Sequence, residues 1–105
     1  MQPMINEEQL KLLTEVLLSL KTEDEARSLL SDLCTIREMQ DLGQRLEVAR
    51  LLRRQMTYSD IAQQTGASTA TISRVNRCLL NGAGGYESIL DKIQAQREKQ
   101  GDEQL

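Results

Sequence analysis

The segment 69–77 combines short side chains with two apolar residues at helical spacing, and this pattern suggests nucleic-acid recognition. Ile72 and Val75 are spaced i, i+3 and would lie on the buried side of a helix. The free side would then carry short side chains that could approach base edges and phosphates in a DNA major groove. These side chains are Thr69, Ala70 and Ser73.

Arginine is concentrated around this segment, although the 105-residue chain has a net charge of −3. The stretch 45–77 holds six arginines and two carboxylates, a local net charge of +4, whereas the rest of the chain holds 7 cations and 14 anions. Phosphate neutralisation drives much of DNA affinity, so this local excess matters more than the net charge. A merely solvated arginine-rich helix face is the alternative. The side chains expected near the phosphates are Arg54, Ser59 and Arg77.

A helix-turn-helix over residues 57–80 would position these side chains. Thr57 and Ser68 are suitable N-cap residues for its two helices, and Gly66 can supply the positive φ of the turn. Ala62 is small enough to let the second helix cross the first closely. Ser68 is also expected at the DNA surface. Two amphipathic helices joined by a glycine turn also occur in ordinary bundles, which is the alternative.

The remaining segments also predict helices, so we expect an all-α fold of about six helices in a single domain, 1–105. The segment 6–33 is expected to form two dimerisation helices, because the apolar positions of the first are too widely spread for one buried stripe. A central helix in a monomeric bundle is the alternative. Residues 36–55 predict a long central helix, and residues 86–99 a C-terminal helix. The expected N-caps of the early helices are Asn6, Thr22 and Thr35.

Several classes of protein are disfavoured by composition. The chain has no histidine, no nucleophile motif and no phosphate-binding glycine loop, so we expect no enzyme, no metal site and no cofactor. Cys34 and Cys78 are expected to be reduced, with a regulatory disulfide as the alternative. No apolar run approaches the ~18 residues of a membrane span and no signal peptide opens the chain, so we expect a cytoplasmic protein without a membrane partner.

Residues 35–77 resemble the tryptophan repressor family. The matching landmarks are Thr35 with Glu38, the run Leu42-Gly43-Gln44-Arg45, Leu51-Leu52-Arg53 followed by Met56-Thr57, and Gly66-Ala67 followed by Ala70-Thr71-Ile72-Ser73-Arg74. The stretch GASTATISRVNRCL with the later GGY looks most like the YerC/YecD-type subgroup.

The resemblance implies an intertwined all-α dimer that acts as a repressor and can respond to a small-molecule effector. The positions that match the family's effector pocket are Thr35, Arg45, Thr71, Arg74, Val75 and Cys78. Val75 and Cys78 stand where the family has glycine and serine. A branched side chain would fill volume that an indole needs, and a thiol hydrogen-bonds an ammonium group poorly. We therefore expect that tryptophan is not the ligand; phosphate contacts or pairing with acids are the alternative roles for Arg45 and Arg74.

These observations predict a dimeric, sequence-specific DNA-binding transcriptional regulator, expected to be a repressor. Its expected partners are double-stranded DNA, a second copy of the chain and a possible small effector of unknown identity. The two half-sites of its operator would lie about one helical turn apart. The competing hypothesis is a protein-interaction or dimerisation module in which the helix-turn-helix is vestigial.

Overall fold

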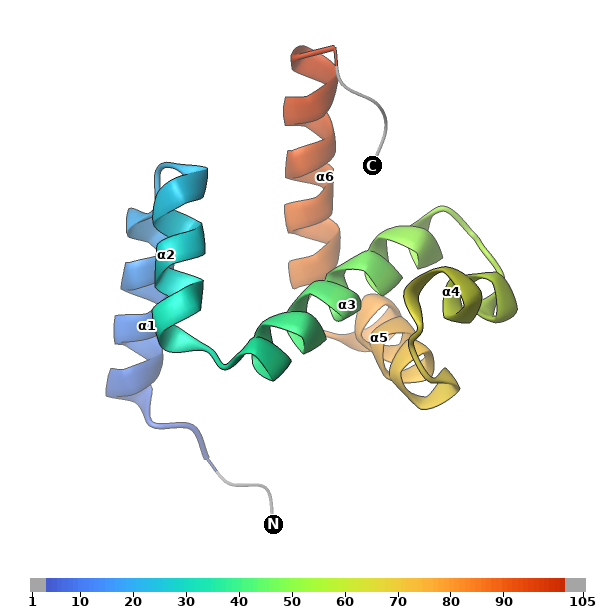
Figure 1. The fold of residues 1–105 in the computed structure, drawn as a ribbon, viewed down its shortest axis with the longest axis horizontal. Coiled ribbons are helices and arrows are strands. Elements are labelled where there is room, and N and C mark those ends of the chain that lie inside the picture. The colour runs from blue at the N-terminus through green and yellow to red at the C-terminus, as the bar shows by residue number, and fades with distance from the viewer. Residues whose placement is uncertain (1–3, 102–105) are drawn as a thin grey trace. The chain divides into compact units, whose positions relative to one another are not determined.

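The computed structural model describes residues 4–101, and these residues fold into six helices without a strand (Figure 1). In chain order the helices are α1 (Glu7–Ser19), α2 (Glu23–Leu33), α3 (Ile36–Arg53), α4 (Tyr58–Thr65), α5 (Thr69–Asn81) and α6 (Gly85–Lys99). The all-α prediction is therefore confirmed. The described residues fall into two compact units, with the boundary between Met39 and Gln40. None of the six helices is long and apolar enough to cross a membrane.

The first unit contains α1 and α2, which lie side by side as a hairpin (Figure 1). Neither Glu7–Ser19 nor Glu23–Leu33 contains a buried residue, and Leu18 is 85 % exposed. The hairpin therefore has no closed core within itself. Its apolar side chains instead line an open groove, formed by Leu12, Leu13 and Val16 of α1 and by Leu29 and Leu33 of α2.

The early helices begin where side-chain capping predicts. Asn6 accepts a hydrogen bond from the backbone N–H of Gln9 at 3.0 Å, and Thr22 with Glu25 forms a reciprocal capping box. Thr35 and Glu38 repeat this arrangement at the start of α3, with distances of 2.8 and 3.1 Å. Hydrogen bonds to the Glu38 carboxylate lower the pKa of Glu38. The larger effect comes from the Thr35 backbone N–H and the smaller one from the Thr35 hydroxyl.

The second unit holds the hydrophobic core of the described chain. α3, α4, α5 and α6 all contribute to it, and the turn between α4 and α5 adds one alanine. Leu52, Met56, Leu79 and Tyr86 pack against its edge. The buried members are Val48, Ala49, Leu51, Ile61, Ala67, Ile72, Val75 and Leu90.

α3 ends at Arg53, two residues earlier than the predicted limit of 55. Gln55 takes a left-handed conformation with φ of 64°. The N–H of Met56 donates to the carbonyl of Leu51, and the N–H of Gln55 to the carbonyl of Leu52. This is a Schellman termination, which is commonly built around glycine and was therefore not evident at a glutamine. α6 begins at Gly85, one residue before the predicted start.

Gln55 and Gly66 both have a left-handed backbone, so substitutions at the two positions can test its energetic cost. Gly66 has φ of 74°, and a Cβ added there would meet no atom within 4 Å. Gly66→Ala should therefore lower the free energy of unfolding by about 1–2 kcal/mol through backbone strain alone. Gln55→Gly should raise it by up to about 1 kcal/mol because the strain is relieved. Urea denaturation of both variants checks the opposite signs, and a stabilising Gly66→Ala would contradict this description of the turn.

Candidate nucleic-acid interface

The turn between α4 and α5 is fixed by hydrogen bonds around Thr65. Its hydroxyl donates to the carbonyl of Ile61 at 2.7 Å and accepts from the N–H of Ala67 at 3.1 Å. Gln44 of α3 donates from Nε2 to the carbonyl of Thr65 at 3.2 Å. α3 and α4 are thus both tied to the turn that leads into α5. The sequence did not reveal Gln44 as a supporting residue, because its partner lies 21 positions away and leaves no local pattern.

Ser68 is the N-cap of α5 and satisfies one backbone N–H of the first turn. Its Oγ accepts from the backbone N–H of Thr71 at 3.1 Å and donates to the Thr71 hydroxyl at 3.1 Å. The predicted cap is confirmed, with Thr71 rather than Ala70 as the donor. The start of α5 is therefore defined by a specific side chain, and Thr69 and Ala70 follow it as exposed residues.

α5 has two opposite faces. Ile72 and Val75 are buried in the core, and Leu79 packs beside them. The other face is exposed and follows the helical spacing i, i+3, i+4, i+7. Its residues are Ala70, Ser73, Arg74 and Arg77. We call these four residues the outward stripe. They include no carboxylate, and a methyl, a hydroxyl and two guanidinium groups follow one another along it.

The residues predicted to contact DNA are all exposed, and they lie on three elements of the second unit. Arg54 lies in the turn after α3, and Ser59 lies in the first turn of α4. The remaining five belong to the start and outer face of α5, namely Ser68, Thr69, Ala70, Ser73 and Arg77. The structure thus leaves every one of the seven accessible to a large ligand.

Ion pairs divide the six arginines of the stretch 45–77 into two groups. Arg53 pairs with Asp91 and, at 3.7 Å, with Glu87, both on α6. Arg50 pairs with Glu47 at 3.7 Å within α3. The other four arginines of this stretch form no salt bridge with any residue of 4–101 and are available to external anions. These are Arg45, Arg54, Arg74 and Arg77.

The six residues of the predicted effector pocket occupy different environments. Val75 is buried in the core, Thr71 and Arg45 are half-buried, and Arg74 lies on the outward stripe. Thr35 belongs to the first unit, where it caps α3. Cys78 lines an open apolar cavity of about 410 Å³, which the other five do not line.

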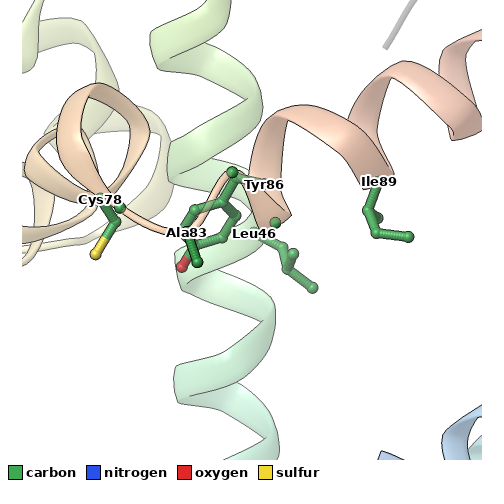
Figure 2. Close-up of a pocket in the computed structure, with 8 residues that line it drawn as sticks. Leu46, Cys78, Ala83, Tyr86 and Ile89 are labelled. Atoms are coloured by element: carbon green, nitrogen blue, oxygen red, sulfur yellow. The ribbon is translucent and has the colours of Figure 1, made fainter.

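That cavity lies where α3, α5 and α6 meet. Leu46 comes from α3, Cys78 from α5, and Tyr86 and Ile89 from α6 (Figure 2). Residues 82–85 complete its wall. No charged side chain lines it, so the cavity is suited to apolar groups rather than to a zwitterionic amino acid.

α4 and α5 are joined by a glycine turn, and α5 has one buried face and one exposed polar face. This arrangement is typical of a helix-turn-helix protein. Residues 8–94 match the family described as Trp repressor protein. The chain belongs to the Trp repressor family, which is a family of DNA-binding regulators.

Known relatives agree with this assignment. The chain is 57 % identical over 77 residues to the uncharacterized protein YerC of Bacillus subtilis (strain 168), covering 73 % of this chain and 74 % of that protein. The crystal structure of a TrpR-like protein from Eubacterium eligens ATCC 27750 has a TM-score of 0.79 and 50 % identity, over 82 % of this chain and 89 % of that one. A candidate Trp repressor from Staphylococcus aureus has the same TM-score of 0.79 at 44 % identity, over 82 % and 86 %. The predicted family resemblance is confirmed.

Two serines allow the cap of α5 to be tested separately from its exposed face: Ser68 is the N-cap, and Ser73 lies on the exposed face. Ser68→Ala should lower the free energy of unfolding by about 1 kcal/mol, because the Thr71 N–H no longer has its partner. Ser73→Ala, on the exposed face of the same helix, should change it by less than about 0.5 kcal/mol. Urea titrations of both variants provide the comparison. Equal losses of stability would mean that Ser68 does not hold the start of α5.

Proposed function

We propose that this protein is a dimeric, sequence-specific transcriptional repressor that binds double-stranded DNA through α5. The observation that carries the proposal is the outward stripe on α5. It is free of carboxylates and is held in orientation by the buried Ile72 and Val75 behind it. Two of its four residues are arginines that form no salt bridge with any residue of 4–101. Such a face can approach a polyanion without disturbing the packing inside the protein.

The exposed groups suggest a division of roles at the DNA surface. Thr69, Ala70 and Ser73 lie in the first part of α5, the part of a recognition helix that contacts base edges. Arg54, Ser59 and Arg77 would position the protein through phosphate contacts, and Ser68 would add one through its exposed hydroxyl. Arg53 is excluded from this set because it pairs with Asp91 and Glu87.

The homodimer is supported by the apolar side chains that the fold leaves uncovered. The hairpin of α1 and α2 has no buried residue in Glu7–Ser19 or Glu23–Leu33. Ile36 is 72 % exposed and Leu80 is 71 % exposed. A second copy supplies matching apolar surface, and a symmetric dimer would present two α5 helices to successive major grooves. We therefore propose the intertwined arrangement implied by the family.

A protein-interaction module with a vestigial helix-turn-helix is the competing function. The same exposed leucines favour it, since large uncovered apolar patches mark sites of association. The two functions differ in what they require of α5. Only a DNA-binding protein needs the outward stripe, so binding to duplex DNA separates them.

Duplex DNA should bind the protein with an affinity that falls steeply as salt rises, because bound arginines release counterions. Ser73→Glu should abolish this binding, because it places a carboxylate on the surface that faces the phosphates. Gln96→Glu, an exposed position of α6, makes the same charge change and should leave binding unchanged. Fluorescence anisotropy across salt concentrations measures the effect, and sedimentation should show that each variant remains a folded dimer.

Neighbouring arginines provide the control for the salt dependence. Arg54→Gln should reduce the slope of log K against log salt by about 0.9 for each phosphate that the arginine had neutralised. Arg53→Gln should leave that slope unchanged, because Arg53 is engaged within the protein. If no duplex binds at low salt, the interaction-module hypothesis replaces the repressor.

We also infer that the repressor does not respond to tryptophan. Val75, which stands where the family has glycine, is buried in the core with Ile72 and Leu51. Its side chain fills space beside α5 rather than leaving a slot for an indole ring. The cavity lined by Cys78 has no charged side chain for the carboxylate and ammonium groups of an amino acid.

Thermal melts with millimolar tryptophan test this inference. Specific binding to the native state must raise the melting midpoint. We expect a midpoint equal to that in the same concentration of glycine, which controls for solution effects of an amino acid. A clear rise with tryptophan alone would show that the Val75 site still accepts the indole.

A further inference from the structure

We propose that the start of α5 recognises thymine through the C5 methyl group of that base, and that Ala70 is the side chain in contact with the methyl. This inference rests on the proposed DNA binding and adds the chemical class of base that α5 reads. It follows from which functional groups the start of α5 presents and which it lacks.

Each base offers different chemistry in the major groove. Arginine or lysine pairs with guanine, asparagine or glutamine with adenine, and carboxylates accept from cytosine, whereas the thymine methyl is met by apolar groups such as alanine. The exposed residues among the first five of α5, residues 69–73, are Thr69, Ala70 and Ser73. They include no amide, carboxylate or cation. Three of the four direct readouts are therefore missing at the start of the helix.

Hydroxyl groups do not supply the missing selectivity. Serine and threonine hydroxyls donate and accept, so they bind either member of a base pair. The hydroxyls of Thr69 and Ser73 can therefore contribute affinity without a strong preference for one base. The methyl of Ala70 cannot hydrogen-bond at all. It is favourable only against an apolar surface, and the thymine methyl is the apolar group of the groove edge.

The geometry of α5 brings this methyl close to the groove floor. Ser68 fixes where the helix begins, and Ala70 follows it as an exposed residue. Thr69, Thr71 and Ser73 around Ala70 are short, so the first turn of the helix can approach the bases closely. Arg74, the first cation of the outward stripe, has its backbone about 6 Å farther along the helix than Ala70. Asn76, the first amide side chain along α5, is half-buried, and Asn81 is the last residue of the helix.

Uracil substitution tests the contact, because uracil differs from thymine only by the missing methyl. The probe is a duplex recovered by selection from a random-sequence library with the full-length protein. Each thymine of its half-site is replaced in turn by uracil, and the Kd is measured by anisotropy. One position should show about fourfold weaker binding, the effect of removing one buried methyl group. The other uracil substitutions should have little effect.

The protein side of the contact is removed by Ala70→Gly. In this variant the sensitive thymine and its uracil replacement should bind equally, because no methyl remains to meet the base. Ala95→Gly makes the same change at an exposed position of α6 and should retain the fourfold discrimination. Melting curves of both variants establish that the fold is kept.

The outcomes separate this inference from the function on which it rests. A selected site without thymine, no uracil effect at any position, or an effect that persists in Ala70→Gly overturns the thymine contact while DNA binding stands. Failure to recover any duplex from the library overturns the proposed DNA binding and this inference together.

Discussion

The rotation of α5 about its own axis is set by the packing of Ile61 and Ile72 in one core, and the candidate interface depends on it. Both side chains are fully buried, and Val75 and Ala67 join them beside α3. A helix turns by about 100° per residue, so a shift of one position would bury Ser73 or expose Ile72. The apolar contacts behind α5 therefore determine which side chains reach a ligand in front of it.

Two adjacent arginines show how backbone geometry assigns different roles to equal charges. Arg53 is the last residue of α3 and reaches Glu87 and Asp91 on α6. Arg54 follows in the Schellman turn and is exposed without an ion pair among residues 4–101. One arginine thus fastens α6 to α3, while its neighbour faces solvent. The positive charge counted from sequence overstates what is available to an external anion.

Local patterns were sufficient to predict the helices, their caps and the helix-turn-helix, because a cap or a helical stripe involves residues within four positions. Ser68 and Thr57 cap their helices as predicted, accepting from the N–H groups of Thr71 and Asp60. Contacts between distant residues were not predictable, including Gln44 with Thr65 and Arg53 with Asp91. The left-handed Gln55 was also missed, since glutamine carries no signal for that conformation. The DNA and effector residues stay predictions.

The uneven distribution of burial links folding, association and DNA binding. Every buried side chain of residues 4–101 lies in the second unit, whereas α1 and α2 have none. Two such helices alone would be marginal, because helical stability in proteins comes mostly from burying an apolar face. In the proposed dimer the second copy supplies that burial, so the stability of the hairpin depends on protein concentration. A monomer would then carry a complete α5 but could contact only one half-site. Occupancy of an operator with two half-sites would therefore depend on the concentration of the dimer rather than on that of the total protein.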